Sequence, residues 1–223
     1  MNLTAMTPFE ERLARKAKET FTNKEKILAN VYFRLLPIAR VGDKVSELFI
    51  GNLYKTYYLA IDISSKGISS SSITWSMLNA FGVSEEDLKA HAEENTLRLF
   101  GKCIEPIMSV ITEMMDADTP FELPIPEDGP KMLVITNESK TYGSALICYK
   151  EILKEIYDYF QDSFWILPSS THEVIALKAS EAISDDLRHM VKEVNNSGAV
   201  APQDLLSNDV FFCSNPSKGI EIA

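Results

Sequence analysis

The residues with the greatest potential for chemistry lie together in the short polar stretch Pro168–Glu173. The hydroxyls of Ser169 and Ser170 come just before the imidazole of His172 and the carboxylate of Glu173. Acyl transfer requires a hydroxyl nucleophile, an imidazole that takes its proton, and a group that orients the imidazole. One hypothesis is therefore a hydrolase or transferase that uses Ser169 or Ser170 with His172 and Glu173.

The same stretch is also typical of a hydrogen-bonded turn. Serine hydroxyls in turns bond to nearby backbone amides, and an imidazole can tie such a loop to its surroundings. Side chains alternate along an extended chain, so His172 and Glu173 would point to opposite sides. Neither a G-x-S-x-G motif nor a cluster of glycines that would bind an oxyanion accompanies the serines. We favour a structural turn and keep catalysis as the alternative.

Two asparagines are candidate ligand-binding residues. Asn95 falls within an apolar stripe formed by Leu88, Ala92 and Leu99 on an expected helix. A buried amide without partners is unfavourable by about 1–3 kcal/mol, so Asn95 must be hydrogen-bonded. A bond to a neighbouring loop is preferred over contact with a ligand. Asn137, the second candidate, directly follows an expected strand.

No motif in the sequence predicts a metal or a cofactor. The three histidines form no H-x-x-x-H pair. The group Asp185, His189 and Glu193 shares one face of an expected helix, but this face lies opposite the apolar stripe and is expected to be solvated. The nine glycines are scattered and match neither G-x-x-x-x-G-K-[ST] nor G-x-G-x-x-G.

Charge is distributed unevenly along the chain. The formal net charge is −10, but residues 1–40 hold eight basic and four acidic side chains, a net +4 that leaves −14 for the remainder. An acidic body repels phosphate backbones, so nucleic acid is disfavoured as its partner. The basic segment could contact RNA, DNA or an acidic partner, but a solvated amphipathic helix is the preferred interpretation.

Composition indicates a protein of the cytoplasm. A content of 45% hydrophobic and 24% charged residues is ordinary for a globular domain. No apolar run approaches the roughly 20 residues that span a bilayer, and the N-terminus lacks the apolar core of a signal peptide. The three cysteines, Cys103, Cys148 and Cys213, are odd in number and far apart, which fits a reducing compartment. We therefore expect no membrane partner.

Local patterns predict the elements of the N-terminal half. Thr7-Pro8-Phe9-Glu10 is a capping box that predicts a helix start, and Ser84 begins a second helix in the same way. The runs 27–36 and 45–50 fit helix or strand equally. The expected elements that follow are a strand over 54–63, a serine-rich turn over 64–72, a return strand over 73–78, a helix over 104–115 and a proline-rich loop over 118–130.

The C-terminal half is predicted to alternate. The runs Phe164–Leu167 and Val174–Leu177 flank the polar stretch and predict a β-hairpin. We also expect strands over 132–136 and 210–213, a strand or helix entry over 145–148, helices over 153–160 and from Ser184, and a loose tail over 214–223. Together these predict an α+β fold with a mixed or mainly antiparallel sheet. The expected organisation is a basic helical segment over 1–40, a domain over 41–213, and the tail.

Several short motifs resemble those of one family. They occur in the same order, and the two longest are Ile166–Val174 (ILPSSTHEV) and Met190–Asn195 (MVKEVN); the others are Gly82–Leu88, Glu94–Thr96, Val134–Asn137 and Leu205–Ser207. The family they resemble is an uncharacterised bacterial one, a domain of unknown function common in anaerobic Gram-positive bacteria of the gut. The resemblance covers roughly residues 45–213. It implies a family but no activity, cofactor or site residue.

The sequence therefore leaves three functional hypotheses. The first is a cytoplasmic binding or interaction protein without turnover, whose surface includes the loop Pro168–Glu173 and whose partner is an unknown protein or small molecule. The second is the hydrolase or transferase described above. The third and weakest is an acidic inhibitor that mimics nucleic acid, which predicts a contiguous stripe of carboxylates.

Overall fold

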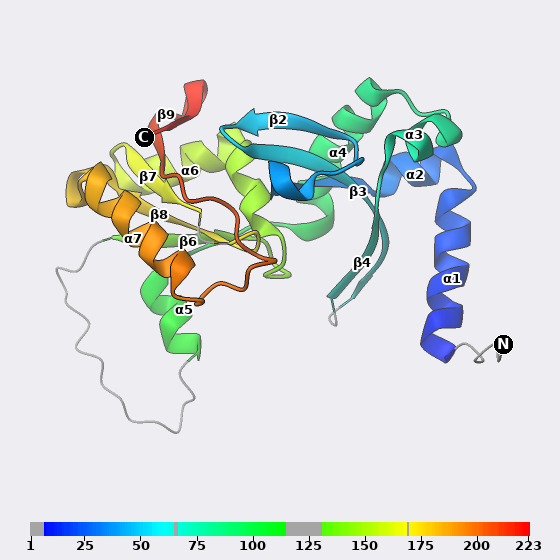
Figure 1. Ribbon diagram of the computed structural model, residues 1–223, viewed down its shortest axis with the longest axis horizontal. Helices are drawn as coiled ribbons and strands as arrows, with labels where there is room; N and C mark the ends of the chain where they lie inside the picture. Colours follow the sequence, from blue (N-terminus) through cyan, green and yellow to red (C-terminus); the bar gives the residue numbers. More distant parts are fainter. Residues whose placement is uncertain (1–6, 65–66, 115–130, 169) are drawn as a thin grey trace.

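Two antiparallel sheets lie side by side and are covered by helices (Figure 1). The computed structural model describes residues 7–64, 67–114, 131–168 and 170–223. One sheet has four strands and the other six, and all the strand pairs among these residues are antiparallel. The expected α+β class is confirmed.

The four-stranded sheet is built around one long strand, β3 (Leu53–Ser64). Strand β1 (Val31–Pro37) pairs with one side of β3, while β2 (Ser46–Ile50) and β4 (Gly67–Ser72) share its other side. The helices of this half are α1 (Pro8–Phe21), α2 (Lys24–Asn30), α3 (Trp75–Phe81) and α4 (Glu85–Phe100), with a short 3-10 helix at Ile38–Arg40. Helix α4 packs against β1.

Two helix starts follow from local chemistry, as the sequence predicts. The Thr7 hydroxyl accepts the Glu10 backbone N–H at 3.3 Å, and the Glu10 carboxylate accepts the Thr7 N–H at 2.7 Å. The Ser84 hydroxyl accepts the Asp87 N–H at 3.0 Å. Each cap satisfies amides that have no partner within their own helix.

The six-stranded sheet has the order β10-β9-β7-β8-β6-β5. Its hairpin of β7 (Phe164–Leu167) and β8 (Val174–Lys178) is confirmed, with Leu167 opposite Ile175. The remaining elements are β5 (Cys103–Pro106), α5 (Ile107–Met114), β6 (Met132–Thr136), α6 (Lys150–Phe160), α7 (Ser184–Asn196), β9 (Phe211–Asn215) and β10 (Gly219–Ile222), with 3-10 helices at Gly143–Cys148, Ala179–Glu181 and Pro216–Lys218.

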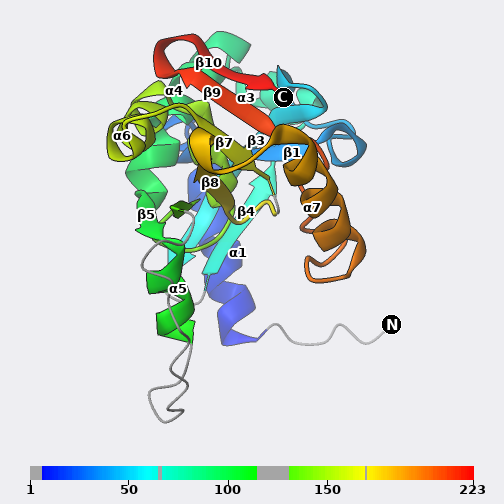
Figure 2. The same ribbon diagram turned by 90° about the vertical axis from the view of Figure 1, so that its left-hand side faces the viewer.

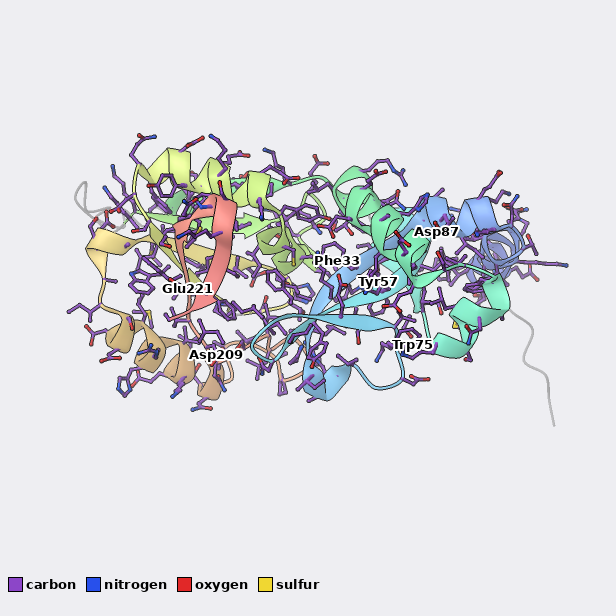
Figure 3. All side chains as sticks on the ribbon, turned by 90° about the horizontal axis from the view of Figure 1, so that it is seen from above. Phe33, Tyr57, Trp75, Asp87, Asp209 and Glu221 are labelled. Carbon is purple, nitrogen blue, oxygen red and sulfur yellow. The ribbon has the colours of Figure 1, made fainter. Side chains whose placement is uncertain are left out.

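One hydrophobic core joins the two sheets. It contains Phe33 and Tyr57 from the four-stranded sheet and Phe164 from the six-stranded sheet. Phe33 and Tyr57 lie near the middle of the molecule in Figure 3, and the Phe33 ring stacks on Tyr149 with centroids 5.8 Å apart. The sequence led us to expect a helical segment over 1–40. Residues 31–37 of this segment instead form strand β1, which supplies part of the core.

Four other expectations differ from the structure. Residues 67–72 form β4 rather than a turn, since β3 supplies their hydrogen-bond partners. Thr74 caps α3 where a strand was expected over 73–78, and residues 103–106 form β5 before α5 begins. The segment 214–223 contains β10, which pairs with β9, and is not a loose tail. The proline-rich loop 118–130 lies outside the described residues.

Candidate functional site

The loop between β7 and β8 is held from both sides by hydrogen bonds to its backbone. The Thr171 N–H donates to the carbonyl of Asp204 at 2.8 Å. The carbonyl of His172 accepts the Gly143 N–H at 2.9 Å and the Thr136 hydroxyl at 2.8 Å. Thr171 is 1% exposed. The backbone of Thr171 and His172 is therefore fixed to neighbouring segments and is not offered as a free surface.

Ser170 has the geometry of a turn-stabilising residue. Its hydroxyl accepts the N–H groups of His172 at 3.0 Å and Glu173 at 3.3 Å, and donates to the Glu173 carboxylate at 2.8 Å. The hydroxyl proton is thus directed at a carboxylate, and the side chain is 4% exposed. Ser169 lies outside the described residues.

Both ring nitrogens of His172 face partners other than Ser170. Its Nδ1 accepts the backbone N–H of Tyr142 at 3.3 Å, and its Nε2 lies 3.2 Å from an Asp204 carboxylate oxygen. Since Nδ1 is an acceptor, the proton of the neutral ring is assigned to Nε2, which donates to Asp204. The group that orients the imidazole is therefore Asp204, not Glu173. Among the described residues, no hydroxyl is placed to lose its proton to His172.

A buried arginine lies behind His172. The rings of Tyr142 and His172 are 5.3 Å apart between centroids, and the other neighbour of Tyr142 is Arg34, whose guanidinium carbon is 3.6 Å from the Tyr142 ring centroid. The same guanidinium lies 4.0 Å from the Tyr58 centroid. Arg34 is 7% exposed. We call the set Arg34, Tyr32, Tyr58 and Tyr142 the arginine cage.

Glu173 points the other way, into a groove of about 520 Å³. We call this the α5 groove. Its walls are mainly apolar side chains from α5 and from three strands of the six-stranded sheet, with a few polar groups among them. The lining residues are Cys103, Glu105, Ile107, Val110, Ile111, Val134, Thr136, Lys140, Glu173 and Ile175. The expected divergence of His172 and Glu173 therefore separates two environments.

The α5 groove exists because two helices cover different parts of one sheet face. Residues that alternate along the strands share this face, among them Val134 on β6 and Ile175 on β8. Helix α7 packs over the β7–β8 part through Leu187 and Val191, while α5 packs over β5 and β6. The two helices are well apart in Figure 2.

The two candidate asparagines have structural partners. The Asn95 amide donates to the carbonyls of Leu28 at 2.7 Å and Val31 at 2.9 Å, at the end of α2 and the start of β1. This is the expected bond to a neighbouring segment. The Asn137 side chain closes a turn by donating to the Thr141 carbonyl at 2.8 Å and accepting the Thr141 N–H at 3.2 Å.

The turn at Asn137 nevertheless leads to residues of both the α5 groove and the arginine cage. It precedes Lys140 and Tyr142, which have the positive φ angles 51° and 59° that non-glycine residues seldom adopt. Lys140 reaches the α5 groove, and Tyr142 reaches the arginine cage. Asn137 is thus a positioning residue for both.

Sequence reasoning missed Arg34, Tyr142 and Asp204. One signal was present, since Arg34 interrupts the apolar run 27–36 and a charge in such a run must find special partners. No local pattern links Arg34 to Tyr142 or His172 to Asp204, because these pairs are distant in sequence.

Within the part of the chain that the structure describes, no three histidine, cysteine, aspartate or glutamate side chains lie close enough together to hold a metal ion. Likewise, no helix in the described ranges has the length and apolar character needed to cross a membrane.

The fold and the loop define an α+β protein with a buried polar loop, an apolar groove on one side of it and a buried arginine on the other. The chain belongs to the family of unknown function DUF5688, whose model matches residues 7–214. The match thus includes the N-terminal helices, beyond the stretch that the motifs indicated. No curated protein and no solved structure matches the chain.

Proposed function

We propose that this protein binds a small amphipathic cation in the α5 groove and does not turn it over. The observation that carries the proposal is a groove of about 520 Å³ whose apolar walls are edged by carboxylates. Small-molecule sites of proteins are typically concave and mainly apolar, with a few polar groups that fix the orientation of the ligand.

The apolar part of the ligand is specified by the helix and the strands. Ile107, Val110 and Ile111 face Val134 and Ile175 across the groove, and all five side chains are only partly buried. Apolar surface removed from water stabilises a complex by about 25 cal/mol per Å². A ligand with an alkyl or aryl portion would complete the burial of these walls.

The charged part is specified by Glu105 and Glu173. Neither carboxylate has an ion-pair partner among the described residues. Among the described residues that line the groove, the one cation is Lys140, whose ammonium lies 3.4 Å from the Glu113 carboxylate. The hydrogen bond from Ser170 fixes one oxygen of Glu173. Carboxylates held at an apolar wall favour an ammonium group over an anion.

We propose binding without turnover because of the hydrogen bonds within the β7–β8 loop. The Ser170 hydroxyl donates its hydrogen bond to the Glu173 carboxylate, and both nitrogens of His172 are occupied by Tyr142 and Asp204. A general base requires a free nitrogen within hydrogen-bond reach of the hydroxyl. We therefore assign the loop to positioning Glu173.

A cytoplasmic location is part of the same proposal. It is supported by the three free cysteines. Burial raises the pKa of Cys213 to about 11 and raises that of Cys103 above its usual value, so both thiols are poorly reactive toward oxidants.

Isothermal titration calorimetry with ligands that share one alkyl chain tests the proposal. Octylamine should bind saturably, octanol more weakly, and octanoate least, because only the ammonium is attracted by Glu105 and Glu173. Affinity for the amine should rise from butylamine to octylamine, since each buried methylene contributes about 0.8 kcal/mol. Equal affinity for octanoate and octylamine would contradict the proposal.

Variants locate the site. Glu105→Gln and Glu173→Gln should each weaken octylamine binding by about tenfold, the size of one charge-assisted hydrogen bond. Glu193→Gln, an exposed change on α7, is the matched control and should leave the affinity unchanged. If all three variants bind octylamine like the unmodified protein, the groove is not the site.

A further inference from the structure

We propose a second binding site, for a phosphate group, at the arginine cage on the opposite side of the same loop. The site is built from the guanidinium groups of Arg34 and Arg40, and it is independent of the amine site in the α5 groove. The two sites are separated by the loop backbone, from which His172 and Glu173 point in opposite directions.

Arg34 is a buried cation with no acidic partner. Its Nε donates to the Tyr32 hydroxyl at 3.0 Å, and its Nη2 donates to the same hydroxyl and to the Ser70 hydroxyl, the latter at 2.6 Å. All of these partners are neutral. None of the ion pairs among the described residues includes Arg34.

Such an arrangement is unusual because buried charges are normally paired. The two tyrosine rings that cover the faces of the guanidinium, Tyr58 and Tyr142, compensate in part, and cation–π contacts contribute about 2 kcal/mol when they are desolvated. Because the rings cover the faces of the guanidinium, an anion would contact its edge. The Nη1 atom of Arg34 makes no hydrogen bond to any of the residues that the structure describes.

Arg40 adds a second cation within electrostatic range of Tyr58 and Tyr142. Its guanidinium donates to the carbonyl of Leu205 at 3.0 Å and to that of Gln203. These two hydrogen bonds hold the segment that carries Asp204. Its buried Nε atom has no hydrogen-bond partner in the described part of the chain.

Arg34 and Arg40 both act on the pKa of the same tyrosine, Tyr58. Burial raises the pKa of Tyr58, and the charges of Arg34 and Arg40 both act against that rise. Burial lowers the pKa of Arg40, and Asp204 acts against that fall. Both guanidinium groups therefore lie within electrostatic range of the Tyr58 hydroxyl.

The balance of charge specifies an anion. Arg34 has no ion pair among the described residues, and the carboxylate that acts on Arg40, that of Asp204, also accepts the hydrogen bond of His172. The planar fork of arginine matches two oxygens of a phosphate or carboxylate. Two cations against one shared carboxylate favour the doubly charged phosphate over a carboxylate. Because the whole chain has a net charge of −10, long-range attraction does not account for binding of an anion, and local contacts must do so.

The test is calorimetric titration with inorganic phosphate, phenyl phosphate and benzoate at constant ionic strength. Phosphate and phenyl phosphate should bind saturably, and benzoate at least about tenfold more weakly. No saturable binding of either phosphate compound would overturn the proposal, as would equal affinity for benzoate.

Two variants and one control assign the binding to the cage. Arg34→Lys keeps a charge but loses the fork, and it should weaken phenyl phosphate binding by about tenfold. Arg40→Gln tests the same site if the Arg34 variant does not fold, and should also weaken binding. Arg15→Gln removes an exposed arginine on α1 and should leave the affinity unchanged. If Arg15→Gln weakens binding as much as Arg40→Gln does, the interaction is a general charge effect and the proposal is wrong. Octylamine affinity should be the same in all three variants.

Discussion

The two sides of the β7–β8 loop are built from the same short stretch but have opposite character. On the Glu173 side, carboxylates edge an apolar groove beneath α5. On the His172 side, an arginine that forms no ion pair with any described residue lies between tyrosine rings. The side chains of His172 and Glu173 diverge at the turn that Ser170 closes, so this short segment supplies a side chain to each environment.

The contrast shows how reactive-looking residues become structural ones. Ser170, His172 and Glu173 are close in sequence, yet the hydrogen bonds divide them between two sides. The loop that follows Asn137 repeats the division, since Lys140 reaches one side and Tyr142 the other. Proximity in sequence therefore says little about shared chemistry when neighbouring side chains point to different environments.

The largest expected effect comes from Gly143, which supports both sides at once. A Cβ added at Gly143 would lie 2.5 Å from the Asn137 backbone nitrogen and 2.7 Å from the Thr136 Cα. Backbone atoms cannot yield easily, so Gly143→Ala should lower the free energy of unfolding by about 3 kcal/mol. Denaturant titration measures this loss, and octylamine and phenyl phosphate should both bind more weakly.

Gly219→Ala is the control for this change. Gly219 has a positive φ of 86°, but a Cβ there meets no atom within 4 Å. It should be less destabilising, at about 1 kcal/mol, and should affect neither ligand. If Gly143→Ala were no more destabilising than Gly219→Ala, the close packing around the loop would be wrong.

Asn95 tests whether a buried polar residue outside both sides is purely structural. Asn95→Ala would leave the carbonyls of Leu28 and Val31 without their donor and should destabilise the protein by about 2 kcal/mol. Exposed Asn79→Ala should change the free energy of unfolding by less than about 0.5 kcal/mol. An altered Kd for either ligand in Asn95→Ala, measured under conditions where it is folded, would reinstate Asn95 as a ligand-binding candidate.

Ser170 should affect one side only. Ser170→Ala removes the bond that fixes the Glu173 carboxylate, so thermal and denaturant unfolding should show a loss of about 1 kcal/mol. Octylamine binding should weaken, whereas phenyl phosphate binding should not. Exposed Ser217→Ala is the control. Hydrolysis of ester or phosphate substrates that Ser170→Ala abolishes would instead revive the catalytic hypothesis.

The smallest expected effect is a change in the reactivity of Cys103, which lies in the wall of the α5 groove. Burial, reinforced by Glu105, raises the pKa of this thiol above its usual value of 9.0. Alkylation requires the thiolate, so the rate of reaction with iodoacetamide should still be rising above pH 9.0. In a Cys148→Ser, Cys213→Ser background, octylamine should slow the reaction and phenyl phosphate should not. A rate that levels off near neutral pH would contradict this assignment.

What the sequence predicted was set by local chemistry. The capping box at Thr7, the cap at Ser84 and the hairpin around residues 168–173 depend on neighbours a few positions apart, and all are confirmed. Two strands that were missed, β4 and β10, form by pairing with the strand that precedes each of them. The serines of β4 form a strand only because β3 offers its edge, and β10 is ordered by β9.

The candidate site divides in the same way. The turn role of Ser170 and the divergence of His172 and Glu173 followed from local rules. The arginine cage did not, because Arg34 lies on β1 and Tyr142 in the turn before the 3-10 helix Gly143–Cys148, and the two meet only when the fold is complete. The α5 groove likewise depends on which parts of a sheet face two helices leave uncovered.

The most direct test of this account is a pair of calorimetric titrations on two variants, Glu173→Gln and Arg40→Gln. If the loop separates two sites, Glu173→Gln should weaken octylamine binding by about tenfold and leave phenyl phosphate binding unchanged, and Arg40→Gln should do the reverse. If either variant weakens both ligands equally, or neither ligand binds the unmodified protein, the central claim of two sites with opposite charge preference is contradicted.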